Sequence, residues 1–162
     1  MRAVIVPEAL LREMRSHARE TYPDECCGFL IAEPDPADDH TARTVVEVHR
    51  ASNDFEGERR RRFVIRPEEL RDAERSVEPT GRVIGGFYHS HPDHPARPST
   101  FDQEHAWPWY TYLVLSTTAQ DVPAVGAFEL DGESGTFREV PLRTAPGDGT
   151  HVTASLRAPG VR

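Results

Sequence analysis

Four of the eight histidines in this 162-residue chain lie between positions 89 and 105, and two of them, His89 and His91, are two residues apart. Side chains two apart on a strand point to the same face, so these imidazoles can be presented side by side while Ser90 points away. Imidazole nitrogens are common zinc ligands. The spacing therefore predicts a bidentate metal clamp at the end of a strand.

Asp102 is the best candidate for a third ligand, because residues 93–98 form a loop long enough to return the next helix to the strand end. Catalytic zinc takes about three protein ligands and leaves a position for water. Ser99-Thr100-Phe101-Asp102 also fits a helix capping box, in which Ser99 caps the helix and Asp102 reaches back to it. The histidine pair upstream favours the ligand role. His94 and His105 are spare ligand candidates that we expect at the surface or behind the ligands.

These residues resemble a known family motif. His89-Ser90-His91-Pro92, six residues, Ser99, two residues and Asp102 reproduce the JAMM (MPN-plus) metalloprotease motif without a gap. Residues 22–30, Tyr-Pro-Asp-Glu-Cys-Cys-Gly-Phe-Leu, resemble the segment that carries the family's glutamate in bacterial and archaeal members. The chain is thus similar to stand-alone prokaryotic JAMM zinc metallopeptidases.

The resemblance implies a role for each residue. His89, His91 and Asp102 would hold Zn²⁺, and Glu25 would act as general base and then protonate the leaving amine. Ser99 would help to stabilise the oxyanion. The competing interpretations are a solvated glutamate for Glu25 and a plain helix cap for Ser99.

The same resemblance suggests a substrate class. Compact prokaryotic members resemble enzymes that cut after the C-terminal Gly-Gly of ubiquitin-like sulfur-carrier proteins, and we expect such a partner here. The alternatives are a deubiquitinase-like isopeptidase and a non-catalytic, metal-stabilised MPN binding module. A zinc nucleobase deaminase is disfavoured, because its His-x-Glu and Pro-Cys-x-x-Cys motifs are absent.

Length and pattern predict one domain, residues 1–143, followed by a disordered tail at residues 144–162 that is rich in glycine, proline and threonine. The family resemblance implies an α/β fold with a mixed sheet flanked by helices, similar to the cytidine deaminase fold. The expected helices are 7–19, 67–77 and one from about 99. The expected strands are 27–32, 43–50, 63–65, 82–91, 110–116, 124–130 and 136–142.

Composition narrows the partners. A formal charge of −8 argues against binding to nucleic acid, and no stretch is apolar enough to span a membrane. Cys26 and Cys27 are adjacent and cannot staple distant segments, so we expect buried thiols and a cytoplasmic location.

The Arg59–Arg62 run stands out in this acidic chain. It is either a solvated loop or a docking site for an acidic partner or peptide tail. If the expected strand 63–65 lies at a sheet edge near the metal, an extended Gly-Gly tail could pair with its backbone.

Overall fold

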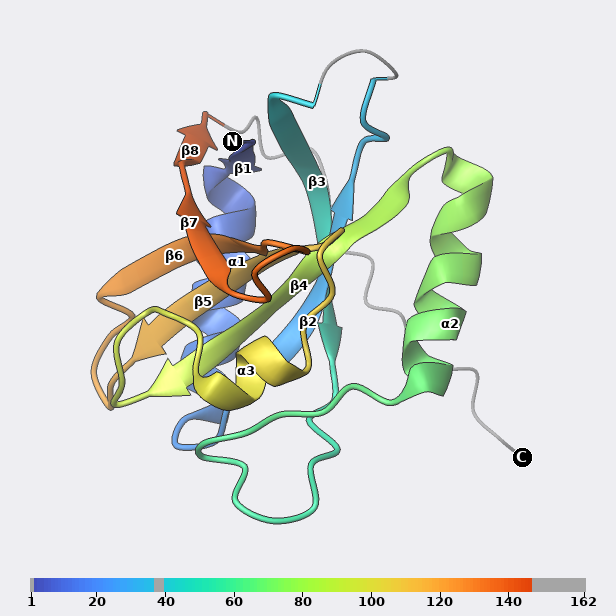
Figure 1. The fold of residues 1–162 in the computed structure, drawn as a ribbon. Helices are drawn as coiled ribbons and strands as arrows, with labels where there is room; N and C mark the ends of the chain where they lie inside the picture. The colour runs from blue at the N-terminus through green and yellow to red at the C-terminus, as the bar shows by residue number, and fades with distance from the viewer. Residues whose placement is uncertain (1, 37–39, 147–162) are drawn as a thin grey trace.

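The computed structural model describes residues 2–36 and 40–146, in which eight strands form one mixed sheet with helices on both faces (Figure 1). The spatial order is β7-β6-β5-β4-β2-β3-β1-β8. The strands are β1 (Ala3–Pro7), β2 (Cys27–Ala32), β3 (Ala42–Ala51), β4 (Val83–Pro92), β5 (Thr111–Thr117), β6 (Ala124–Leu130), β7 (Phe137–Val140) and β8 (Leu142–Ala145). Strand β4 runs parallel to β5 and antiparallel to β2. The expected fold class is confirmed.

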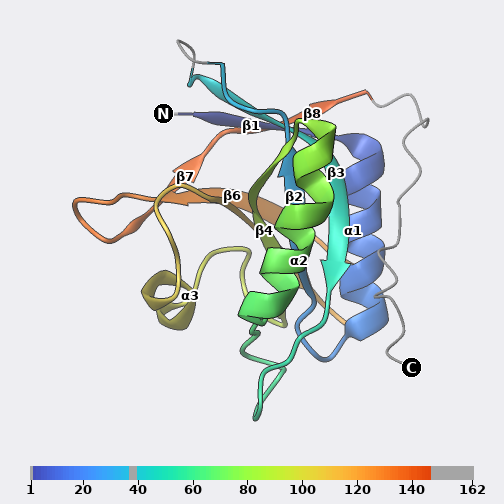
Figure 2. The same ribbon diagram turned by 90° about the vertical axis from the view of Figure 1, so that its right-hand side faces the viewer.

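The helices divide between the two faces of the sheet (Figure 2). Helix α1 (Glu8–Thr21) covers one face, and α2 (Pro67–Val77) and α3 (Thr100–Glu104) lie on the other. A short 3-10 turn, Glu78–Thr80, follows α2. Alternating residues of the strands pack in two separate hydrophobic cores. Leu30 and Tyr88 lie on the α1 side, and Phe29 and Phe87 lie on the α2 side. Successive residues of β4 therefore face different surroundings.

Apolar spacing accounts for the helices. In α1, the buried residues Leu10, Leu11, Met14 and Ala18 recur at helical intervals. Helix α2 begins with Pro67 at its first position, where a missing N–H costs no helical hydrogen bond.

A glycine lets β4 approach β5 closely just before the histidine pair. A Cβ atom on Gly86 would lie 1.8 Å from the Thr111 carbonyl oxygen, so no other residue fits without a backbone shift. The parallel pairing that follows places His89 beside Val114 and His91 beside Ser116. This close approach anchors the end of β4 where the candidate ligands lie.

The predicted elements agree with the structure over most of the described chain and differ at β1, at residues 63–65 and near the C-terminal end. Strands 27–32 and 124–130 have the expected bounds, but β1 was not predicted. Residues 63–65 are not a strand. The Val64 N–H donates to Asn53 Oδ1, and the Val64 carbonyl accepts from the Asp54 N–H. Both backbone groups of Val64 are therefore hydrogen-bonded within a loop.

The predicted strand 136–142 is instead two strands, because β7 pairs with β6 whereas β8 crosses to pair with β1. Strand β8 extends to Ala145, two residues past the expected domain end at 143. The expected disordered tail lies outside the described residues from 147 onwards. None of the described helices is both long and apolar enough to cross a bilayer.

Candidate metal centre

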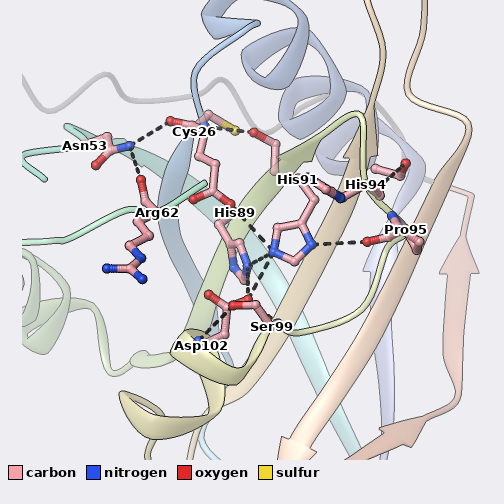
Figure 3. Close-up of polar contacts among 12 residues, drawn as sticks. Cys26, Asn53, Arg62, His89, His91, His94, Pro95, Ser99 and Asp102 are labelled. Carbon is pink, nitrogen blue, oxygen red and sulfur yellow. Dashed lines mark hydrogen bonds and ion pairs between the residues drawn. The ribbon is translucent and has the colours of Figure 1, made fainter. Parts of the chain in front are cut away.

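Strand β4 and helix α3 bring the three predicted ligands together (Figure 3). His89 and His91 point to the same face as Phe87, as their two-residue spacing predicts. Asp102 reaches them from the first turn of α3. The relative exposures are 1% for His89, 7% for His91 and 8% for Asp102, so the cluster is largely shielded from water.

The three candidate ligand atoms are mutually 3.1 Å apart. The distances join His89 Nε2 to His91 Nε2, His89 Nε2 to Asp102 Oδ2, and His91 Nε2 to the same Asp102 oxygen. Ligand atoms arranged tetrahedrally around zinc lie about 3.3 Å from one another. The side chains are thus already spaced as a small cation requires.

The tautomer of His91 also fits a cation. His91 Nδ1 lies 3.1 Å from the Pro95 carbonyl oxygen, which can only accept, so Nδ1 carries the hydrogen. In the neutral ring, Nε2 then presents a lone pair towards the Asp102 carboxylate. Two lone pairs repel unless a cation or a proton lies between them. The Pro95 contact is of the kind that orients metal-binding histidines.

The position of Asp102 suits both roles that the sequence left in competition. Its Oδ2 accepts a hydrogen bond from the Ser99 backbone N–H at 2.8 Å, and its own N–H donates to Ser99 Oγ at 3.1 Å. This capping box holds the carboxylate while the same oxygen faces both histidines. Burial would raise the pKa of Asp102, but His89, His91 and the Ser99 amide hold it well below its usual value.

His89 is fixed by packing as well as by its partners. The Phe63 ring stacks on its imidazole with centroids 4.5 Å apart. Burial lowers the pKa of His89 and so favours the neutral ring, which is the form that binds metals. The buried His89 Nδ1 has no hydrogen-bond partner in the described part of the chain.

Glu25 lies next to the three candidate ligands, just before the start of β2. Cys27 pairs with His89 across β2 and β4, and the residue two before it therefore lies beside His91. Glu25 Oε1 is 3.6 Å from His91 Nε2, and the residue is 2% exposed. Burial, reinforced by the charge of Asp102, raises the pKa of Glu25 to about 9, a shift that a nearby cation would oppose.

Glu25 with the two histidines makes a second possible ligand set, whose ligand atoms lie within 4.8 Å of one another. The shorter contacts favour Asp102 as the third ligand. Asp102 Oδ2 lies 3.1 Å from both imidazoles, whereas Glu25 Oε1 lies 3.6 Å from one. Glu25 Oε2 is buried without a hydrogen-bond partner in the described chain, so that oxygen is available for another group.

Asn53 was missed by sequence reasoning. Its Nδ2 donates to the carbonyls of Glu25 at 3.2 Å and Arg62 at 3.0 Å, and its Oδ1 accepts from the N–H groups of Phe55 and Val64. One side chain thereby ties the loop beside the site to the backbone of Glu25. Only its position between a strand and a polar loop marked it in the sequence.

The site lies between two cavities of different character. One, of about 230 Å³, is lined mainly by apolar side chains and reaches His89 and Asp102. The other, of about 400 Å³, reaches Glu25, His91 and Ser99 and is lined by arginines. The Ser99 hydroxyl uses a lone pair for the helix cap, which leaves its hydrogen free to donate.

The remaining predicted residues lie outside the cluster. His94 and His105 are exposed, as expected, and His105 stacks on Phe101. Cys26 and Cys27 are buried free cysteines, and burial raises the pKa of both thiols.

Fold and site together define an α/β protein with a buried His–His–carboxylate cluster that could hold a metal ion. Comparison with known proteins gives the family: residues 7–130 match the model for prokaryotic homologs of the JAB domain. A desampylase from Haloferax volcanii is 42% identical over 130 residues, covering 77% of this chain and 84% of that protein. The chain belongs to the family of prokaryotic JAB-domain proteins, which confirms the predicted resemblance.

Solved structures agree. A protein from Desulfitobacterium hafniense has a TM-score of 0.75 at 28% identity, covering 89% of this chain and 94% of that one. A protein from Salinibacter ruber has a TM-score of 0.66 at 31% identity, covering 93% and 94%. A JAB1/MPN domain protein from Archaeoglobus fulgidus shares the fold at 16% identity, with a TM-score of 0.51 and coverage of 88% and 98%.

Proposed function

We propose that this protein is a zinc-dependent peptidase or isopeptidase that hydrolyses the bond after the C-terminal Gly-Gly of a ubiquitin-like protein. The observation that carries the proposal is the set of three ligand atoms 3.1 Å apart with a buried carboxyl group beside it. The Haloferax relative, named a desampylase, supports an isopeptidase activity. The two buried free cysteines support a cytoplasmic location.

In this proposal His89, His91 and Asp102 hold the zinc. When bound, zinc lowers the pKa of water and polarises a carbonyl group. The chain supplies the rest: the Pro95 carbonyl and the Ser99 amide fix the directions in which His91 and Asp102 point.

Glu25 moves the proton. Glu25 lies beside His91. Unlike Asp102, it takes no part in the helix cap, and one of its oxygens has no hydrogen-bond partner in the described chain. As a carboxylate it accepts a proton from the attacking water, and as an acid it returns that proton to the leaving nitrogen. The second step requires Glu25 to lie beside the leaving nitrogen.

Ser99 is proposed as a donor to the developing oxyanion. Its hydroxyl is fixed by the N–H of Asp102, so its remaining hydrogen has a restricted set of directions. The helix cap and the oxyanion contact use different parts of one hydroxyl group.

The substrate class rests on the relative and on the shape of the site. We assign the acyl side of the substrate to the apolar cavity, because Glu25 does not line it. Residues 63–65 border that cavity as an irregular segment, so pairing of a Gly-Gly tail with a regular edge strand is not expected. A sulfur-carrier protein remains our leading candidate for the ubiquitin-like substrate.

The test is hydrolysis of a ubiquitin-like protein extended beyond its Gly-Gly, and of the same protein linked through its C-terminus to a lysine side chain. We expect mass spectrometry to show cleavage after the second glycine. Glu25→Gln should keep its zinc and lower kcat by at least about 100-fold. Zinc binding without cleavage of either substrate would support a metal-stabilised binding module instead.

A further inference from the structure

The cavity beside Glu25 differs in charge from the rest of the molecule. Of the residues that line its approximately 400 Å³, three are arginines, Arg60, Arg61 and Arg97, and Glu25 alone is acidic. The whole chain carries 27 acidic residues and 19 arginines and has a net charge of −8. A cationic cavity at the candidate active site therefore runs against the overall composition.

The three arginines are exposed. No ion pair joins Arg60, Arg61 or Arg97 to any residue in the described part of the chain. By contrast, Arg50 lies 2.8 Å from Glu13, and Arg138 lies 3.2 Å from Asp131. The guanidinium groups around the cavity are thus available to an external anion.

Backbone hydrogen bonds hold the two segments that carry these arginines next to the candidate site. The Arg59 carbonyl accepts from the Glu25 N–H at 2.7 Å, and the Arg61 N–H donates to the Glu58 carbonyl at 3.2 Å. On the other wall, the Arg97 N–H donates to the Pro95 carbonyl, the same group that orients His91. Figure 3 shows Pro95 next to His91 in this wall.

The position of Glu25 indicates which part of a substrate this cavity receives. A group that protonates the leaving nitrogen must lie beside it, and Glu25 lines the arginine cavity but not the apolar one. The product released with the new amine therefore departs through the cavity that holds Arg60, Arg61 and Arg97.

We propose that Arg60, Arg61 and Arg97 form a carboxylate-binding subsite for the leaving-amine side of the substrate, which rests on the proposed hydrolase function. Guanidinium groups match the planar carboxylate and can bind it through two N–H groups. The carboxylate has two possible sources: the α-carboxylate of a residue attached directly after Gly-Gly, or acidic side chains flanking an acceptor lysine. Both place a negative charge beside the scissile bond on the side of Glu25.

The experiment compares matched substrates. The first pair is a ubiquitin-like protein ending in Gly-Gly-Ala with a free carboxylate or with a terminal amide. The second pair carries the Gly-Gly isopeptide on the lysine of a capped Glu-Lys-Glu or Gln-Lys-Gln peptide. We expect the acidic member of at least one pair to have a kcat/KM about five-fold higher or more, an advantage that salt should reduce.

The variant Arg60→Ser/Arg61→Ser should bring this ratio close to one, and Arg97→Ser should lower it. Arg12→Ser/Arg19→Ser is the matched control, because it removes the same charge from exposed positions on α1, across the sheet. Equal rates for both members of each pair in the wild type, or a preference that survives in Arg60→Ser/Arg61→Ser, would overturn the subsite. Cleavage of the neutral substrates reports on the proposed function separately.

A binding measurement keeps the subsite testable without turnover. We expect capped Glu-Lys-Glu, or alanine with its free carboxylate, to shift the arginine Nε–Hε resonances of the zinc-loaded protein in NMR spectra. Capped Gln-Lys-Gln and alaninamide should not, and Arg60→Ser/Arg61→Ser should abolish the shift. If none of the probes causes a selective shift, the subsite is refuted.

Discussion

The two faces of β4 treat buried histidines in different ways. On the α1 face, His17 Nδ1 lies 2.8 Å from the hydroxyl of Tyr88, a residue of β4. On the other face, His89 and His91 lie within 3.1 Å of each other and of Asp102. Tyr88 and His89 are adjacent in sequence, yet each belongs to a separate arrangement.

The difference is one of stoichiometry. The α1 face offers one ring nitrogen and one hydroxyl group, which satisfy each other inside an apolar core. The opposite face crowds two ring nitrogens and one carboxylate oxygen around a single point. A buried histidine thus indicates a candidate metal site when more nitrogen and oxygen atoms meet at one point than hydrogen bonds among them can satisfy.

The largest effect is expected from removing ligands on the α3 face. His89→Ala and Asp102→Ala should each weaken zinc binding by more than about 100-fold, whereas His17→Gln should leave it unchanged. Metal content after dialysis against a competing chelator measures this. Zinc retention in His89→Ala equal to that in His17→Gln would remove the distinction between the two faces.

Asp102→Asn separates the ligand role from the cap. The amide oxygen can still accept from the Ser99 N–H, but its neutral side chain is a poorer zinc ligand than a carboxylate. We expect near-normal thermal stability of the metal-free protein with a large loss of zinc affinity. Full zinc retention would return Asp102 to a purely capping role.

The next largest effect concerns Ser99. Ser99→Ala should lower kcat by about 100-fold through loss of the proposed oxyanion donor, and should lower stability by about 1 kcal/mol through loss of the cap. Ser99→Thr keeps a hydroxyl group and should recover most of both. Steady-state kinetics with denaturant unfolding separates the two effects, and a stability loss without a rate loss would leave Ser99 as a cap alone.

The convergence of the three candidate ligands was predictable from sequence because their signals are local. The two-residue spacing of His89 and His91 fixes a shared face on any strand, and residues 99–102 carry a capping pattern. Strand β2 was likewise predictable, since its six buried residues form a short, continuous apolar run. Placing Glu25 beside them depended on the family resemblance, because only the β2–β4 pairing brings it there.

The features that were missed depend on contacts between distant segments. Strand β1 is short and pairs in parallel with β3 and β8, so its stability comes from partners far along the chain. Residues 63–65 have the composition of a strand, but the side chain of Asn53 binds the Val64 N–H and keeps them in a loop. The hydrogen bonds by which Asn53 joins its own loop to the Glu25 backbone could not be predicted from the residue types around it.

Asn53 gives the next prediction, since the candidate site relies on a loop whereas the α1 face relies on regular elements. Asn53→Asp keeps the oxygen that accepts from Phe55 and Val64 but removes the donor to the carbonyls of Glu25 and Arg62. We expect kcat to fall by about 10-fold with zinc affinity unchanged, because misplaced catalytic groups lose rate before binding.

A readout other than activity identifies this as positioning. Hydrogen exchange should become faster at residues 53–64 in Asn53→Asp and stay unchanged in α1. Asn53→Gln retains both polar groups and should recover part of the rate. A rate loss without faster exchange in the loop would contradict a positioning role for Asn53.

The smallest effect is expected on the α1 face and concerns pH. Burial, together with the charge of Arg50, lowers the pKa of His17 to about 4 from its ordinary value of 6.5. The folded state therefore binds this proton less readily than the unfolded state, and His17 stabilises the fold fully only above about pH 6.5. As the pH falls from 6.5 towards 4, the unfolded state takes up a proton that the folded state excludes, so this stability is lost. Between pH 7 and pH 5 the loss is about 2 kcal/mol.

His17→Gln can still bond to Tyr88 but does not titrate, so its free energy of unfolding should fall by about 2 kcal/mol less over this range. Guanidinium unfolding of both proteins at pH 7 and pH 5 measures the difference, and contributions from the metal ligands cancel because both proteins contain them. Parallel pH dependence in the two proteins would mean that His17 titrates normally and that the α1 face does not hold a neutral histidine.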